Sequence, residues 1–271
     1  MKSILLHINR DEGQEARFQA AVDIARYFES HLNCLQVAPL EIFASADPYG
    51  VSYLVSESLE KIREVAGDQQ AAMENRLRGE GLPWDWHYHP GDPARLLGDH
   101  SWLTDLVVIS APDGDWKPRL SAPPTAADVV VRSRAPVLVV PSASRGFDCT
   151  APIAIAWNGS AEACAAIRAA MPLLRQASSV HLLTVAEEHG PDFPPVEASA
   201  YLSRHGVASE LHELERGAAP ISETLLEGAQ QCKAGCLVMG AYGHSRLRES
   251  VLGGVTRGML QKASLPLLLA H

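Results

Sequence analysis

Residues 235–271 read GCLVMGAYGHSRLRESVLGGVTRGMLQKASLPLLLAH, and residues 105–141 read DLVVISAPDGDWKPRLSAPPTAADVVVRSRAPVLVVP. The two stretches align without a gap at a constant offset of 130, which places Pro136 opposite Pro266 before each last apolar run. Short, continuous apolar runs on either side of a helix-length segment are typical of parallel strands buried on both faces. The sequence therefore indicates a tandem repeat of a unit with a parallel sheet.

The beginnings of the two copies repeat as well. Residues 3–37 and 152–185 each contain an apolar strand, a polar turn, a helix and a second apolar strand. In the second copy the helix is expected over residues 161–174, opening at Ser160, a residue type that caps helices well. Five strands are predicted in each half, at residues 3–9, 31–37, 84–89, 105–110 and 136–140, and at residues 152–157, 179–185, 207–214, 236–240 and 266–270.

These elements predict an α/β protein of two tandem five-stranded parallel-sheet domains, at residues 1–141 and 151–271. The turn-forming residues of PSASRGFDCTA, 141–151, are typical of a linker between them. Right-handed crossovers and a doubly wound order place a crevice at the carboxyl ends of strands 1 and 4 of each half. A ligand is expected in that crevice.

Composition excludes several classes of protein. A formal net charge of −9 over 271 residues argues against a protein whose whole surface binds nucleic acid. Five cysteines without CxxC spacing indicate neither a disulfide framework nor a zinc knuckle, but reduced and mostly buried thiols. The first residues, MKSILLHINR, have too short an apolar run for a signal peptide, and no run approaches the roughly 18 apolar residues of a membrane span. We expect a cytoplasmic protein without a membrane partner.

The loop after the fourth strand of the second half is the candidate ligand site. Gly240 and Gly243 allow a tight turn and a close backbone approach to a ligand. Gly253 and Gly254 present backbone N–H groups at the positive end of the next helix, where anions bind readily. Other side chains that could reach a polyphosphate are those of Thr256, His244, Ser245, Arg246 and Arg248. The alternative is that these glycines only serve turns and helix packing.

The spacing of the loop carries a resemblance. The loop contains Gly240-x-x-Gly243, then nine residues, then Gly253-Gly254-Val255-Thr256. This spacing resembles the nucleotide motif G-x-x-G-x9-G-(S/T) of the universal stress protein family. The resemblance covers nearly the whole chain as two tandem copies. It implies a fold similar to flavodoxins and adenine-nucleotide alpha-hydrolases with strand order 3-2-1-4-5. It also implies a fifth strand that pairs copies into dimers, and bound ATP without a known enzymatic conversion.

Family roles transfer to positions of this chain as expectations. The resemblance implies that the adenine and ribose contact Ala156, Trp157, Asn158 and Val185. It implies that the ribose and the first phosphates contact Met239, Gly240, Tyr242 and Gly243, and that the phosphate tail contacts Gly253, Gly254, Val255 and Thr256. His244 and Arg246, in the span between the glycines, are expected near the phosphates, which could carry Mg²⁺. Asn158 stands where the family usually has Asp, and Gly254 where Ser or Thr is usual, which leaves the affinity open. Trp157 could stack on the base or plug the pocket.

The first half has a different loop. The offset of 130 places Ser110 opposite Gly240, Asp113 opposite Gly243, Pro123 and Pro124 opposite Gly253 and Gly254, and Ala126 opposite Thr256. Proline lacks the N–H that would donate to a phosphate, and Asp113 adds negative charge. We predict that the first half does not bind a nucleotide and serves as a structural partner of the second half.

Other candidate residues are weaker. His87 and His89 lie two apart on a predicted strand, a spacing that could hold a metal, but no third ligand is near in sequence. His7 is interpreted as a core histidine, and Cys232 and Cys236 as buried packing residues. No P-loop, nucleophile elbow or dinucleotide G-x-G-x-x-G appears where it should, so no metal site and no catalytic residue is assigned.

The sequence thus predicts a nucleotide-dependent sensor or binding module of the stress response, with ATP in its second half. The two halves are expected to form a pseudo-dimer within the chain, through the strand edges PVLVV and PLLLA or the faces beside them, and a homodimer is a further expectation. Two alternatives remain open. One is a slow ATP-hydrolysing or phosphoryl-transferring enzyme, and the other is a scaffold that binds a different small ligand.

Overall fold

The computed structural model describes residues 1–38, 51–112, 125–186, 193–241 and 254–271, with backbone only for residues 51–65 and 125. The strands are β1 Ser3–Ile8, β2 His31–Ala38, β3 Trp84–Pro90, β4 Leu106–Ser110, β5 Val137–Val140, β6 Ile153–Ala156, β7 Val180–Val185, β8 Glu210–Leu214, β9 Cys236–Gly240 and β10 Leu267–Ala270. The helices are α1 Gln14–Phe28, α2 Val51–Glu80, α3 Pro93–His100, α4 Thr125–Arg132, α5 Ala161–Leu174, α6 Pro195–Arg204, α7 Ile221–Gln231 and α8 Gly254–Lys262.

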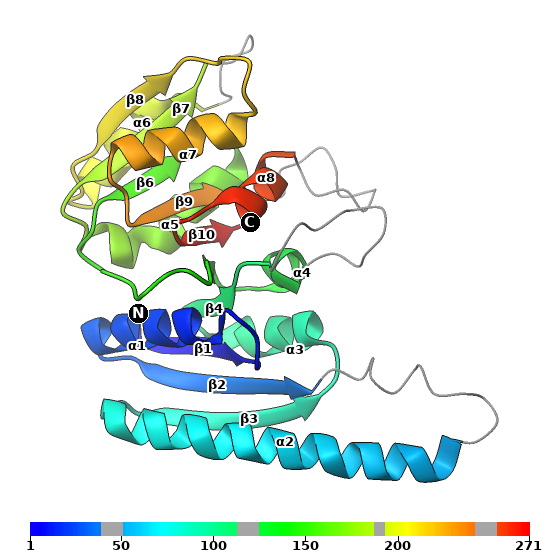
Figure 1. Ribbon diagram of the computed structural model, residues 1–271. Helices are drawn as coiled ribbons and strands as arrows, with labels where there is room; N and C mark the ends of the chain where they lie inside the picture. The colour runs from blue at the N-terminus through cyan, green and yellow to red at the C-terminus, as the bar shows by residue number, and fades with distance from the viewer. Residues whose placement is uncertain (39–50, 113–124, 187–192, 242–253) are drawn as a thin grey trace.

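All ten strands form one sheet in the order β3-β2-β1-β4-β5-β10-β9-β6-β7-β8. The predicted order 3-2-1-4-5 is present in each half, and neighbours within a half pair in parallel. The two five-stranded units are continuous, because β5 and β10, which contain the strand edges named above for contact between the halves, pair antiparallel, with Leu138 opposite Leu268. In Figure 1 the N-terminal half lies below and the C-terminal half above this junction.

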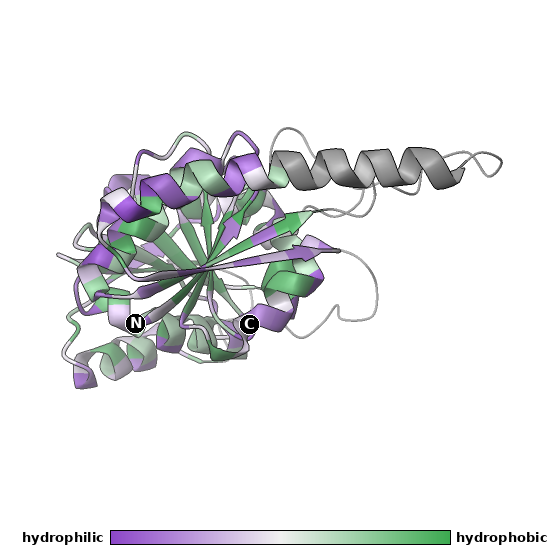
Figure 2. Ribbon diagram, turned by 90° about the horizontal axis from the view of Figure 1, so that it is seen from below, coloured by the Kyte–Doolittle hydropathy of each residue, from purple (hydrophilic) through white to green (hydrophobic). Residues whose placement is uncertain are grey.

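Two hydrophobic cores cover the two faces of the sheet. One contains residues of α1, α2, α5 and α6, and the other contains residues of α3, α4, α7 and α8. Figure 2 shows the apolar strands crossing the centre of the molecule, with helices on both sides that turn their hydrophilic residues outward. This layering follows from the sequence, since continuous apolar runs such as VLVV at 137–140 leave neither face of a strand polar.

Local signals in the sequence set several boundaries of these elements. The α5 helix spans the predicted residues Ala161–Leu174, and the Ser160 hydroxyl accepts a hydrogen bond from Ala163 N at 3.2 Å. The α8 helix spans Gly254–Lys262. The predicted strand at 207–214 is shorter in the structure, since β8 begins at Glu210.

Burial confirms the interpretation of Cys236 as a packing residue, whereas Cys232, for which the same was expected, is only half-buried. All five cysteines are free thiols, and Cys34, Cys149 and Cys236 are buried. Burial raises the pKa of each of these three thiols to about 12, so they remain protonated and unreactive near neutral pH.

None of the described helices is both long enough and apolar enough to cross a bilayer.

Candidate functional site

The carboxyl ends of β6 and β9 meet where the strand order of the C-terminal half reverses. Ala156, the last residue of β6, lies beside Met239 of β9 in the register of the sheet. Both side chains are buried and belong to the core that α7 and α8 cover. Two of the predicted nucleotide-binding residues are therefore neighbours at the expected topological switch point.

Asn158 lies in the turn that follows β6. Its side-chain oxygen accepts a hydrogen bond from Ser160 N at 3.2 Å, and Gly159 between them has a φ of 76°, which favours glycine. The side chain of Asn158 is exposed, and the turn leads directly into the capped start of α5. Since the amide oxygen holds the turn, the NH₂ group is the part of Asn158 that can donate to a ligand.

Trp157 is directed into the protein core. It is 4% exposed and belongs to the core cluster under α5 and α6. Its indole Nε1–H donates to the Phe193 carbonyl at 3.1 Å, just before α6. The indole thus connects the end of β6 to the segment that follows β7.

Val185 is the last residue of β7 and is half-buried against the other core. It pairs with Leu214 of β8, and the next residue, Ala186, donates its N–H to the Leu214 carbonyl. Val185 therefore stands at the same edge of the sheet as Ala156, one strand further out.

Gly240 has a packing role that is independent of any ligand. A Cβ at this position would lie 2.5 Å from both the Ala163 nitrogen and the Glu162 carbonyl carbon, in the first turn of α5. Because backbone atoms cannot move aside easily, only glycine lets β9 end so close to this helix. For Gly240, the alternative interpretation in terms of packing is sufficient.

The start of α8 is different. Gly254 is exposed, and a Cβ there would meet no described atom within 4 Å, so packing within the described residues does not require glycine. Val255 is half-buried, whereas Thr256 is 5% exposed, which directs its side chain mainly inward. The backbone N–H groups of this first turn are thus better placed to meet a solvent-borne anion than the Thr256 hydroxyl.

Seven of the residues that the sequence analysis names for the site lie outside the described residues. These are Tyr242, Gly243, His244, Ser245, Arg246, Arg248 and Gly253. In the first half the same applies to Asp113, Pro123 and Pro124, whereas Ser110 ends β4 and Ala126 is buried in α4.

A buried arginine occupies the switch point of the N-terminal half. Arg17 of α1 donates through Nε to the His7 carbonyl at 2.7 Å and through Nη2 to the Asn9 carbonyl. Its Nη1 contacts Asp11 Oδ1 at 2.5 Å and Ser110 Oγ at 2.7 Å. The Arg17 side chain is 1% exposed. It joins the end of β1 to the end of β4, across the edge where a ligand of this half would bind.

The position of the C-terminal half that corresponds to Arg17 is not an arginine. Ile4 of β1 pairs with Leu106 of β4, and Ile153 of β6 pairs with Cys236 of β9. The residues of β1 and β6 therefore correspond at an offset of 149, and those of β4 and β9 at an offset of 130. At the offset of 149, Ala166 corresponds to Arg17. Sequence reasoning missed this difference, because an arginine three residues into a helix has the ordinary pattern of an exposed residue.

His7 is a buried core histidine, as predicted. It is 7% exposed, and its Nε2 atom has no hydrogen-bond partner among the described residues. Burial, together with the charge of Arg17, lowers its pKa to about 3. His7 is therefore neutral near physiological pH.

His87 and His89 of β3 have a third histidine beside them. The ring of His100, at the end of α3, lies 5.6 Å from the His87 ring and 5.2 Å from the His89 ring, centroid to centroid. The sequence could not indicate this neighbour, because it comes from a different element.

Comparisons with known proteins support the family resemblance and the fold. The family model described as the universal stress protein family matches residues 1–141. A universal stress protein from Archaeoglobus fulgidus DSM 4304 shares the fold with a TM-score of 0.78 at 14% identity, over 99% of this chain and 96% of that chain. A functionally unknown protein from Pseudomonas aeruginosa PAO1 has a TM-score of 0.63 at 17% identity, over 99% and 92%. The comparison with curated proteins finds no match.

The family model covers the entire N-terminal half, and the C-terminal half repeats the same five-strand unit in the same order. The chain belongs to the universal stress protein family.

Proposed function

We propose that the chain binds ATP, or a related adenine nucleotide, at the carboxyl ends of β6, β7 and β9, and acts as a nucleotide-dependent sensor or binding module. The observation that carries the proposal is the contrast between Arg17 and Ala166. In the N-terminal half a buried guanidinium takes the backbone acceptors at the switch point. In the C-terminal half the corresponding side chain is a methyl group.

The chemistry of the second switch point suits a nucleotide. The half-buried Val185 offers an apolar surface for a base one strand away from the buried Ala156, and the exposed Asn158 amide offers a donor for a base or ribose. At the start of α8 the exposed backbone of Gly254 offers N–H donors at the positive end of a helix. The nucleotide would bind as its Mg²⁺ complex, with the ion held through the phosphates.

The test is a calorimetric titration of the full-length protein with ATP, ADP and AMP in the presence of Mg²⁺. The informative variant replaces Gly253 and Gly254 with Pro, which reproduces Pro123 and Pro124 of the first half. Proline is tolerated in the first turn of a helix but removes the N–H donors. We expect at least about a tenfold loss of ATP affinity, since each lost hydrogen bond to a charged group is worth roughly 1.5–3 kcal/mol.

The matched control replaces Pro123 and Pro124 with Gly. It gives the first half the glycine pair of the second half while Arg17 remains at the switch point, so the stoichiometry is expected to stay at one nucleotide per chain. Failure of the wild-type protein to bind any adenine nucleotide would contradict the proposal. An unchanged affinity in the Gly253→Pro, Gly254→Pro variant would show that the backbone N–H groups at the start of α8 do not bind the nucleotide. Analysis of the same samples for ADP over time measures hydrolysis.

A further inference from the structure

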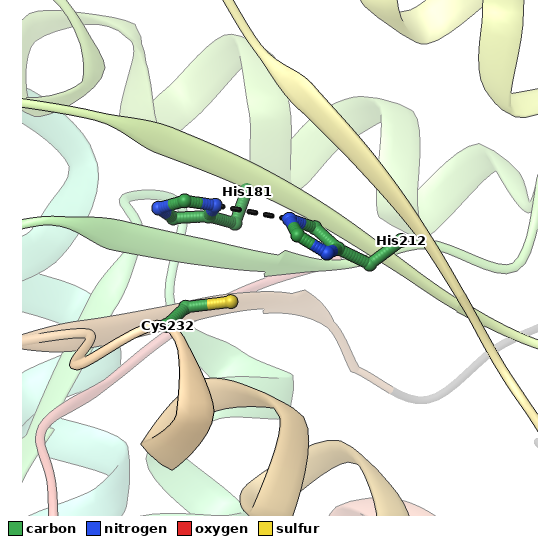
Figure 3. Close-up of side chains that lie close together, drawn as sticks. All are labelled: His181, His212 and Cys232. Atoms are coloured by element: carbon green, nitrogen blue, oxygen red, sulfur yellow. Dashed lines mark hydrogen bonds between the residues drawn. The ribbon is translucent and has the colours of Figure 1, made fainter.

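A cluster of metal-ligating side chains lies away from the candidate nucleotide site. In the described part of the chain, one ligand atom each from His181, His212 and Cys232 comes within 4.8 Å of the other two. Figure 3 shows the imidazoles of His181 and His212 facing each other, with the Cys232 sulfur beside them. We propose that these three side chains bind a thiophilic divalent metal ion, for which Zn²⁺ is the best match.

Three different elements bring these residues together. His181 on β7 and His212 on β8 lie on the face of the sheet that α7 covers, because residues two apart on a strand share a face and Leu183 lies opposite His212. Cys232 is the residue that ends α7. The helix stops there because Lys233 takes a left-handed φ of 53° while Ala234 donates its N–H to the Ala229 carbonyl. The thiol is thereby held over the two strands.

The spacing of the atoms fits a tetrahedral ion. Ligand atoms about 2.0–2.3 Å from a tetrahedral zinc lie roughly 3.3–3.6 Å from one another. The Nδ1 of His181 is 3.1 Å from the Nε2 of His212. A carboxylate oxygen of Glu210, which is opposite His181 in the sheet, is 3.5 Å from the first nitrogen and 3.7 Å from the second. The Cys232 sulfur lies within 4.8 Å of a ring nitrogen of each histidine and would move closer on binding.

The hydrogen bond on the other ring nitrogen of His181 also suits a histidine that binds a metal. Its other nitrogen, Nε2, lies 2.9 Å from the Ser179 hydroxyl oxygen. When Nε2–H donates to that oxygen, Nδ1 is left with the lone pair that a metal needs, and the ring orientation is fixed. His181 is 8% exposed, whereas the Glu210 side chain is 69% exposed. The site is therefore held from inside by His181 and open on the side of Glu210, which supplies the fourth ligand.

The set of donor atoms selects the metal. Two imidazoles, one thiolate and one carboxylate suit Zn²⁺, whereas Mg²⁺ and Ca²⁺ prefer oxygen ligands alone. Without a metal, the two rings can share one hydrogen bond, but that bond gives no reason for a thiol at the same point. Burial and the Glu210 charge raise the pKa of Cys232, so binding displaces the thiol proton to solvent as the Zn–S bond forms.

This site is independent of the proposed nucleotide function. His181 is the second residue of β7, near its amino end, whereas Val185 at the carboxyl end belongs to the nucleotide site. The sequence did not reveal the cluster because the two histidines are 31 residues apart and meet only through the register of β7 and β8.

The test uses the full-length protein without an affinity tag, reduced and stripped of metal with a chelator. Co²⁺ replaces Zn²⁺ as a spectroscopic probe, since a thiolate ligand produces a charge-transfer band and tetrahedral geometry produces strong visible bands. We expect one Co²⁺ per chain with both features, and their loss on addition of one equivalent of Zn²⁺. Cys232→Ser is expected to abolish the charge-transfer band, and His212→Gln to weaken binding at least about tenfold.

Two matched controls are available. Cys164→Ser removes another half-exposed cysteine, and His87→Gln removes the histidine at the register position of β3 that corresponds to His212. Both are expected to leave the spectrum unchanged. Ser179→Ala is expected to keep the charge-transfer band but to weaken binding about tenfold through the lost orientation of His181.

A second measurement does not depend on any variant. One equivalent of Zn²⁺ is expected to protect Cys232 from alkylation in the folded wild-type protein, as read by peptide mass spectrometry, while Cys164 reacts at an unchanged rate. Absence of the charge-transfer band, its persistence in Cys232→Ser, or equal alkylation of Cys232 with and without Zn²⁺ would each overturn the assignment.

Discussion

Gly13 at the start of α1 faces Ser110 at the end of β4 so closely that a Cβ on Gly13 would lie 2.6 Å from the Ser110 Cβ and 2.3 Å from its hydroxyl oxygen. The second half has the corresponding contact with the residue types exchanged. There the strand ends with the glycine, Gly240, and the helix contributes the larger residue, Glu162. In each half, one of the two elements must end or begin with glycine for the helix to pack on the strand.

Gly13→Ala is therefore expected to reduce the free energy of unfolding by about 1–3 kcal/mol, the usual effect of overpacking. In a Ser110→Gly background the same substitution is expected to have a smaller effect, because its closest neighbours have been removed. Denaturant unfolding of the two single variants and the double variant measures this coupling. Gly79→Ala is the control, since a Cβ there meets no described atom within 4 Å and alanine favours the α2 helix. Equal effects of Gly13→Ala in both backgrounds would refute the contact.

Arg17→Met is expected to destabilise the protein by about 3–5 kcal/mol. The substitution leaves Asp11, the buried carbonyl of His7 and the partly buried carbonyl of Asn9 without the guanidinium that now satisfies them. Arg78→Met removes an ion pair with Glu74 that is largely exposed, and should change stability by about 0.5 kcal/mol or less. Urea unfolding of both variants gives the comparison, and similar values for the two would be inconsistent with a structural role for Arg17.

The buried, neutral His7 is expected to make the free energy of unfolding sensitive to acid. Its pKa is lowered from 6.5 in the unfolded chain to about 3 in the folded protein, so the unfolded state binds the extra proton between these values. The stability that a neutral His7 supports is present above pH 6.5 and is lost progressively as the pH falls toward 3. Between pH 7 and pH 5 this group alone accounts for a loss of about 2 kcal/mol. In His7→Leu the stability lost over that interval should be smaller by this amount, as measured by denaturant unfolding at the two pH values.

Trp157→Phe separates the two roles that the sequence left open for this indole. Since Trp157 is 4% exposed and donates to the Phe193 carbonyl, the variant should lose about 1 kcal/mol of stability. Its affinity for ATP should change by less than about threefold, because Phe keeps the apolar contacts in the core. A loss of affinity much larger than the loss of stability would instead show that the indole stacks on the base.

The positions of the strands could be predicted from the sequence because they depend on local information, whereas their order within each half followed from the resemblance to the universal stress protein family. Continuous apolar runs identified β4, β5, β9 and β10, and Ser160 marked the start of α5. The packing role of Gly240 could not be predicted, since glycine in a loop carries the same local signal whether it approaches a phosphate or a helix. The Arg17 contacts and the His181, His212 and Cys232 cluster depend on register and on which face each residue occupies. Both are properties of paired strands and packed helices rather than of any single segment.

The antiparallel pairing of β5 with β10 joins two copies of the unit within one polypeptide. In a symmetric homodimer every substitution occurs twice, so neither subunit can change its switch point without the other. Here a guanidinium at position 17 and a methyl group at position 166 coexist in the same sheet. Covalent linkage therefore releases the two halves from the constraint of symmetry, and each can specialise while the shared sheet stays intact.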